Sequence, residues 1–190
     1  MDSLREHVDT ATTTLVCVPS MGTESRCADL LAAAGDDSTV LWVSFTRPPS
    51  ACVEAYRAGY DTDAELSVIA VGDTAPADAT PASVTVETVS TPDDLTGLGI
   101  TLSQALSAHD DVVVCFDSLT VLLQYVDRET AYEFLNAVTG HLYATDATAH
   151  FHLDPAALDT ETIDALASLF DAVAEREDGE WSVHKRKLLH

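Results

Sequence analysis

The chain has 190 residues, of which 9 are basic and 32 acidic, and its formal net charge at pH 7 is −23. A uniform negative charge of this size repels nucleic-acid phosphates, so we expect no direct binding to DNA or RNA. The acidic residues are spread along the whole chain and lysine is almost absent. This composition is typical of halophilic proteins, whose acidic surfaces stay hydrated in molar salt.

Short segments rich in β-branched and other apolar residues recur along the chain, and each predicts a strand. In chain order they are residues 13–18, 40–45, 66–71, 84–86, 112–116 and 147–153. The segment 112–116 contains three consecutive valines, which indicates a central strand of a parallel sheet, buried on both faces. Asp117 follows it at the carboxyl end. Further along, Asp178-Gly179 separates two strand-like runs and predicts a hairpin.

Between these strands, apolar residues recur at helical spacing. The segments with this spacing are about residues 24–34, 50–58, 95–106, 128–144 and 160–170. Asp127 and Thr160 are the expected N-caps of the last two helices, and Tyr132 is expected to point inward. Alternating strands and helices predict a single α/β domain over residues 1–190. We expect a mainly parallel sheet with helices on both faces and a C-terminal antiparallel hairpin.

Cysteine usage and apolar stretches bear on the cellular location. Cys17, Cys27, Cys52 and Cys115 show neither CxxC nor Cys/His spacing. We therefore expect reduced, buried thiols and no disulfides. No apolar stretch reaches the roughly 18 residues of a membrane span, and the first residues lack signal-peptide character. These features predict a cytoplasmic protein that does not insert into membranes.

Three stretches together resemble the RecA/KaiC-like family of P-loop ATPases, in particular divergent KaiC-like proteins of halophilic archaea. They are Pro19-Ser20-Met21-Gly22-Thr23, residues 43–50 with Tyr60-Asp61 soon after, and residues 114–120 around Asp117. The resemblance covers nearly the whole chain and implies a RecA-like sheet. It also implies that the strand over residues 147–153 lies between the strands of Cys17 and Cys115. That strand would hold these two cysteines about 9 to 10 Å apart, too far for a disulfide.

The phosphate-binding loop that the resemblance implies lacks the residues that bind phosphate and magnesium. A Walker A loop needs glycines whose N–H groups wrap the phosphates, a lysine that reaches them, and a hydroxyl that binds magnesium. The corresponding residues here are Pro19, Gly22, Thr23, Glu24, Ser25 and Arg26. Pro19 and Glu24 replace glycines, while Ser25 replaces the lysine and Arg26 the hydroxyl. In addition, Thr46 stands where KaiC-like ATPases carry the glutamate that activates water.

These losses predict a catalytically inactive RecA/KaiC-like domain, a pseudo-ATPase that needs no cofactor. Its role would be regulatory or scaffolding, through contacts with a protein partner or with further copies of itself. The alternative is an unconventional nucleotide-binding protein or ATPase that uses Asp117 and Ser118 with ATP and magnesium. In the inactive domain, Asp117 would instead accept hydrogen bonds from its turn. Arg47 would hold an anion in the nucleotide-binding protein and pair with a surface acid in the inactive domain.

A third function rests on His150, His152 and Asp154, which alternate along one strand and its end, so that their side chains share a face. Two imidazoles and a carboxylate suit zinc or another divalent ion. The alternative is a pair of hydrogen-bonded buried histidines, with Asp154 starting the turn at Pro155.

Overall fold

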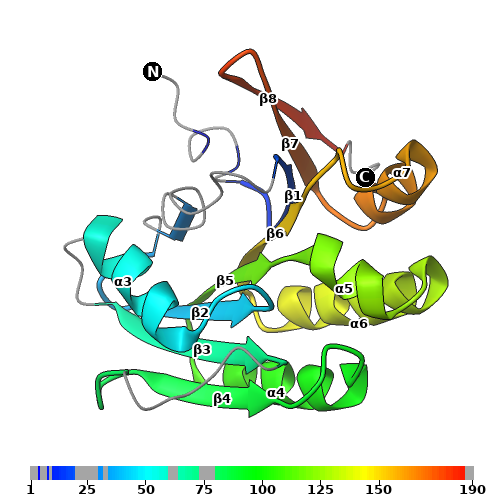
Figure 1. Ribbon diagram of the computed structural model, residues 1–190. Coiled ribbons are helices and arrows are strands. Elements are labelled where there is room, and N and C mark those ends of the chain that lie inside the picture. The colour runs from blue at the N-terminus through cyan, green and yellow to red at the C-terminus, as the bar shows by residue number, and fades with distance from the viewer. Residues whose placement is uncertain are drawn as a thin grey trace.

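The computed structural model describes residues 4, 8, 10–19, 30–31, 34–59, 64–72 and 80–186. In this part of the chain, eight strands form one sheet in the order β4-β3-β2-β5-β6-β1-β7-β8 (Figure 1). Their bounds are β1 Thr13–Cys17, β2 Thr39–Ser44, β3 Glu65–Val71, β4 Thr85–Val89, β5 Val112–Asp117, β6 Thr148–Leu153, β7 Ala172–Glu177 and β8 Glu180–Lys185. Neighbouring strands pair in parallel, except β7 and β8, which are antiparallel. The predicted α/β fold with a C-terminal hairpin is confirmed.

The burial of the strands matches their positions in the sheet. All residues of β1, β2 and β5 are buried, as suits strands covered on both faces. Conversely, β4 at the edge is largely exposed. β6 lies between β1 and β5, which confirms the order that the family resemblance implied. The hairpin turns at Asp178 and Gly179, whose φ angles of 48° and 90° suit a two-residue turn between twisted strands.

The described helices connect the parallel strands. They are α3 Pro49–Gly59, α4 Leu95–Ala108, α5 Leu119–Tyr125, α6 Arg128–Ala144 and α7 Thr160–Ala167. Asp127 caps α6 as predicted, accepting a bond from the Thr130 N–H at 2.8 Å. The predicted cap Thr160 is wrong by one residue, because Asp159 caps α7. Its carboxylate accepts bonds from both the N–H and the hydroxyl of Thr162, at 2.8 and 2.9 Å. None of the described helices is long and apolar enough to cross a membrane.

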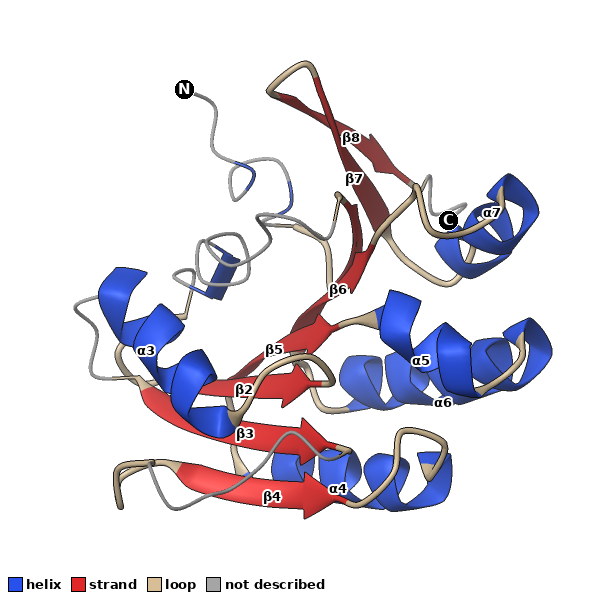
Figure 2. Cartoon of the chain, in the orientation of Figure 1, coloured by secondary structure: helices blue, strands red, loops and turns tan. Residues whose placement is uncertain are grey.

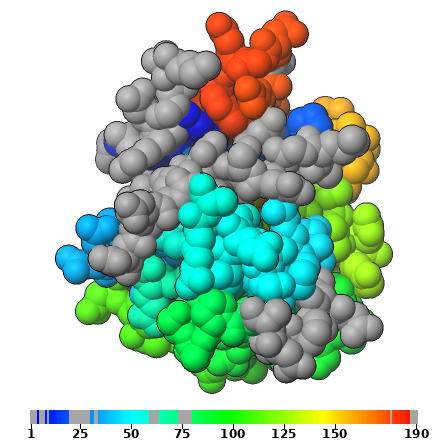
Figure 3. Space-filling view, turned by 60° about the vertical axis from the view of Figure 1, so that its left-hand side comes forward, coloured from blue at the N-terminus to red at the C-terminus, as the bar shows by residue number. Residues whose placement is uncertain are grey.

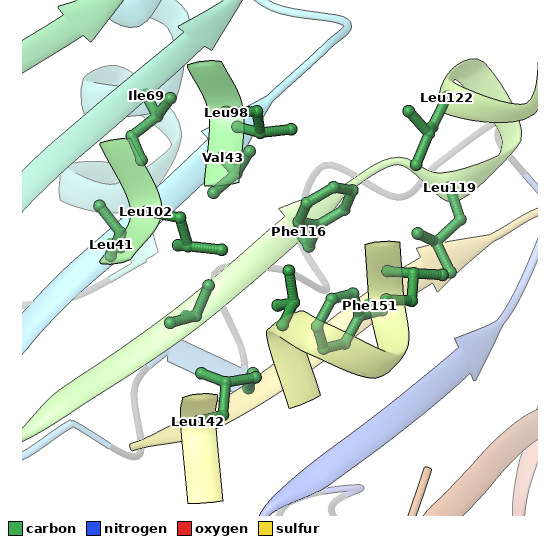
Figure 4. Packing of buried hydrophobic residues seen from close by; sticks show 14 of the residues in the cluster. Leu41, Val43, Ile69, Leu98, Leu102, Phe116, Leu119, Leu122, Leu142 and Phe151 are labelled. Carbon is green, nitrogen blue, oxygen red and sulfur yellow. The ribbon is translucent and has the colours of Figure 1, made fainter. Parts of the chain in front are cut away.

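The larger core lies on the face of the sheet covered by α4, α5, α6 and α7. Its centre is a row of aromatic rings, with Phe151 5.2 Å from Phe116 and 4.9 Å from Phe170 between ring centroids. Figure 4 shows Phe116 and Phe151 among leucines from β2, α4, α5 and α6. Helix α6 turns Ala131 and Leu135 toward this core, both fully buried. The inward position predicted for Tyr132 is therefore wrong. Tyr132 follows Ala131 by one residue, which is a rotation of about 100° around the helix axis, so its side chain points away from the core and is 37% exposed.

The opposite face carries α3 and two smaller clusters. Figure 2 shows α3 on the other side of the sheet from α4 and α6, and Figure 3 shows the surface that α3 forms. Cys52, Val53 and Tyr56 of α3 pack with Trp42 and neighbouring strand residues. A separate cluster surrounds Val16 of β1 and extends to the hairpin. The sheet is thus covered by helices on both faces, as predicted.

One carboxylate ties the amino ends of β1 and β7 together. The backbone N–H groups of Thr12 and Thr13 both donate to Oδ2 of Asp171 at 3.1 Å. The hydroxyl of Tyr143 donates to the other oxygen, Oδ1. Burial and this bond to the carboxylate raise the pKa of Tyr143. The carbonyl of Asp171 accepts from the Arg186 N–H at 2.7 Å, so the end of β8 joins the same junction.

The dispersed acidic residues predict that folding requires high salt. Lowering KCl from about 3 M to about 0.1 M lengthens the Debye length from under about 3 Å to about 10 Å, so carboxylate repulsion grows. We expect the melting temperature and the far-UV circular dichroism signal to fall steadily across this range. Sucrose, which does not screen charge, serves as the control and should not replace the salt. A melting temperature independent of KCl would contradict the prediction.

The thiols of Cys17 and Cys52 should be unreactive in the folded protein. Burial, together with the Glu175 carboxylate, raises the pKa of Cys17 to about 12, and burial raises that of Cys52 to about 11. At pH 8 both groups stay protonated, and only the thiolate reacts. We expect iodoacetamide to label neither residue in molar KCl, as measured by peptide mass spectrometry, and to label both after unfolding in urea. Equal labelling rates in the two states would contradict this.

Candidate functional site

A cavity of about 400 Å³ opens beyond the carboxyl ends of β2, β5 and β6. In open α/β sheets ligands bind at this edge, which makes the cavity the candidate ligand crevice. The residues that line it are Val18, Thr46, Arg47, Asp117, Ser118, Thr120, Val121, Gln124, His152, Leu153 and Asp154. The structure therefore brings both predicted nucleotide-site residues, Asp117 and Ser118, to one crevice.

Asp117 ends β5 and is only 6% exposed. Its Oδ2 accepts a hydrogen bond from the hydroxyl of Thr46 at 3.3 Å, and its carbonyl accepts from the Phe45 N–H at 2.7 Å. The peptide bond from Asp117 to Ser118 is cis. The Ser118 hydroxyl accepts from the Val121 N–H at 3.3 Å and so caps α5. The side chains of Asp117 and Ser118 thus each accept a hydrogen bond from the protein itself.

The loop after β2 is held by the last residue of that strand. The Ser44 hydroxyl accepts from the Arg47 N–H and donates to the Arg47 carbonyl, each at 3.0 Å. This closed turn sets Thr46 and Arg47 in the crevice wall. The crevice therefore combines a guanidinium and a carboxylate, with a threonine hydroxyl bonded to the carboxylate.

Asp154 follows β6 and has a structural part in the opposite wall. Its backbone N–H donates to the Thr120 hydroxyl at 2.8 Å, which joins the ends of β6 and α5. Its Oδ1 accepts from the Ala156 N–H at 2.9 Å, across Pro155. This bond is the turn-starting role given above as the alternative to metal binding.

Of the residues assigned to the degenerate loop, Pro19 lies in the described part of the chain. Pro19 is exposed just after β1. The other residues assigned to the loop, Gly22, Thr23, Glu24, Ser25 and Arg26, lie outside the described residues, as do Tyr60 and Asp61.

A second constellation lies on the face of the sheet that α3 covers. One ligand atom from each of Cys115, His150 and His152 lies within 4.8 Å of the others, and all three residues are buried. The two imidazole rings are 5.3 Å apart between centroids and nearly perpendicular, at 79°. Burial and the neighbouring His152 hold the pKa of His150 well below its usual range, so this imidazole is neutral. Thiol sulfur and neutral imidazole nitrogen are ligands that zinc prefers.

The cysteines differ from expectation at one position. Cys17 and Cys52 are free and buried, as predicted. The absence of disulfides predicted for the chain is wrong for Cys115, which is disulfide-bonded. Its partner is not Cys17, since β6 lies between the two strands.

Sequence reasoning identified the two histidines but missed Cys115 as their neighbour. The sequence predicts a small buried hydrophobic residue at Cys115 and names Asp154 as the third ligand. The family resemblance already placed β6 beside β5, so a signal was present. What it lacked was the register, in which Cys115 stands opposite His150.

The chain is similar in fold to a solved structure and in sequence to one protein family. A solved structure from a structural study of a Pyrococcus horikoshii OT3 protein aligns with 99% of this chain and 94% of its own, at a TM-score of 0.63 and 13% identity. At this identity the likeness concerns the fold alone. No curated protein matches the sequence significantly. The family model that matches does so over residues 11–176, and the chain therefore belongs to DUF7504, a family of unknown function.

Proposed function

We propose that this chain is a catalytically inactive RecA/KaiC-like domain that acts as a regulatory or scaffolding protein through protein contacts. The observation that carries the proposal is the hydrogen bond from the Thr46 hydroxyl to Asp117, at 3.3 Å. In KaiC-like ATPases, which the sequence resembles, the position of Thr46 holds the glutamate that activates water. Here the side chain at that position donates a hydrogen bond to the crevice carboxylate instead of presenting a base.

The other groups of the crevice support the same conclusion. Hydrolysis of a phosphoanhydride needs a positioned base for water and cations for the developing charge. A threonine hydroxyl is too weak a base for this, and Asp154 is engaged in its turn. Among the described residues that line the crevice, Arg47 is the only cation. The sequence of the degenerate loop adds Glu24 and removes the lysine, which further disfavours a bound polyphosphate.

The alternative, an unconventional nucleotide-binding protein or ATPase, draws on one specific observation. Asp117, Ser118 and Arg47 line a crevice of about 400 Å³ at the edge where α/β sheets bind ligands. Asp117 would then hold magnesium and Arg47 a phosphate.

Titration with ATP and magnesium in about 3 M KCl distinguishes the two functions. A ligand at 100 times its Kd stabilises a folded protein by about 2.7 kcal/mol, which a thermal shift detects readily. We expect no shift at millimolar ATP and no phosphate release. The variant Pro19→Gly/Glu24→Gly/Ser25→Lys/Arg26→Thr, which restores the loop, should acquire nucleotide affinity if the crevice is otherwise intact. A shift in the natural protein that the near-isosteric Asp117→Asn variant abolishes would instead establish the alternative.

A candidate contact surface lies on the face of the sheet that α4 and α6 cover. A cavity of about 450 Å³ runs between α4 and α6, lined by Leu95, Ile100, Phe134, Val138 and further apolar and polar residues. Ile100 is 55% exposed at this groove. None of the described residues that line the groove is acidic, although the chain carries 32 acidic residues. Two copies can therefore meet here without pressing carboxylates together, and we take a second copy of the chain as the occupant.

Replacing Ile100 with glutamate should weaken self-association. The substitution puts a charge into an uncharged apolar contact, while the free energy of unfolding should change by less than about 0.5 kcal/mol because the side chain is exposed. Light scattering in molar KCl would show oligomers of the natural protein and monomers of Ile100→Glu. Tyr125→Glu is the matched control, since Tyr125 is also 55% exposed but lies outside the groove. A natural protein that stays monomeric at about 100 μM would contradict this contact.

A further inference from the structure

Three side chains with metal-binding chemistry meet in the middle of the sheet, apart from the groove and beneath the crevice. Cys115 comes from β5, and His150 and His152 come from β6. Their relative exposures are 0%, 5% and 2%. The ligand atoms of all three lie within 4.8 Å of one another.

The sheet itself creates this arrangement. Strands β5 and β6 lie side by side in the sheet (Figure 1) and pair in parallel. In their register Cys115 stands opposite His150. Side chains alternate along a strand, so His152 points to the same face as His150. On the far side of β6, Thr14 stands opposite His150 and Val16 opposite His152. Backbone pairing of two central strands therefore holds the three ligands before any ion binds.

The surroundings of the trio are apolar. Cys115 belongs to the cluster of Trp42 and Val113, and Val16 belongs to the neighbouring cluster on the same face. Zinc binds imidazole nitrogen at about 2.0 to 2.1 Å and thiolate sulfur at about 2.3 Å. Bound zinc therefore places its ligand atoms roughly 3.3 to 3.6 Å apart in tetrahedral geometry. The ligand atoms need to approach one another by at most about 1.5 Å to reach this spacing.

We propose that Cys115, His150 and His152 bind a zinc ion when Cys115 is reduced. Reduction matters because Cys115 is disulfide-bonded in the structure. An external dithiol breaks that bond by exchange: its two sulfurs become a disulfide, and the two protein sulfurs each gain a proton and an electron. Once Cys115 is reduced, its thiolate and the two imidazoles supply three ligands, and water can take the fourth position of a tetrahedral zinc ion.

The site is accessible from both edges of the sheet. His152 lines the crevice at the carboxyl edge, and His150 lines a second cavity, of about 330 Å³, at the opposite edge. An ion can therefore reach the trio without opening the core. This metal site goes beyond the proposed function and does not depend on it, because no crevice residue other than His152 takes part.

Cobalt titration of the reduced protein tests the proposal. The full chain in molar KCl is reduced with dithiothreitol, freed of it under anaerobic conditions and titrated with Co²⁺. We expect saturation at one equivalent, with a thiolate charge-transfer band and intense tetrahedral d–d bands. Zinc should displace the cobalt, and elemental analysis should then find one zinc per chain. A reduced protein that binds no stoichiometric cobalt or zinc overturns the proposal.

Variants assign the ligands. Cys115→Ser, His150→Gln and His152→Gln should each weaken metal binding by more than about 10-fold. Cys52→Ser and His184→Gln are matched controls and should bind like the natural chain, since Cys52 is a buried cysteine outside the trio and His184 an exposed histidine. Unchanged affinity in all three trio variants overturns the proposal. Should those variants fail to fold, Cys17→Ser/Cys52→Ser decides, because the charge-transfer band must persist in it.

The remaining cysteine of the sequence, Cys27, lies outside the described residues and has its own variant. In Cys27→Ser we expect one-to-one cobalt binding with the charge-transfer band retained, because Cys115 supplies the thiolate. Loss of binding in this variant combined with full binding in the trio variants would overturn the assignment to the trio.

Discussion

The parallel register between β5 and β6 is the constraint on which the interior of this fold depends. It sets Cys115 opposite His150 and Phe116 opposite Phe151. On one face the two phenylalanines join the aromatic row of the larger core, at 5.2 Å between ring centroids. On the other face the same pairing gathers the sulfur of Cys115 and two imidazoles. A slip of one residue would exchange these faces, placing imidazoles in the apolar core and phenyl rings among the polar groups.

The crevice depends on the same strand ends and is held by short polar bonds. Ser44 closes the loop after β2, and Thr120 receives the N–H of Asp154 after β6. These bonds maintain the shape of the crevice. Within it, the Thr46 hydroxyl donates a hydrogen bond to the Asp117 carboxylate. Backbone geometry and packing preserve the crevice regardless of which side chains line it, so its shape alone does not fix its chemistry.

The sequence predicted the elements well, because hydrophobic period and local caps decide them. The valine run of β5, the Asp127 cap and the Asp178-Gly179 hairpin are all local signals. Tyr132 was misplaced because a one-residue shift on a helix moves a side chain by about 100°, which apolar spacing alone does not resolve. The partnership of Cys115 with the histidines depends on strand register, a tertiary property with no local signal. The crevice bond between Thr46 and Asp117, 71 residues apart, is hidden in the same way.

The metal proposal and the crevice meet in one strand. Cys115 and Asp117 lie two residues apart on β5, so their side chains share the face on which His150 and His152 lie. His152 belongs to the trio and also lines the crevice beside Asp117. A zinc ion bound to Cys115 and His152 would fix the floor of the crevice from below. Its positive charge would also offset part of the repulsion among carboxylates in a chain of net charge −23. Such an ion would therefore stabilise the floor of the crevice through ligands that lie beneath it, whichever ligand the crevice binds.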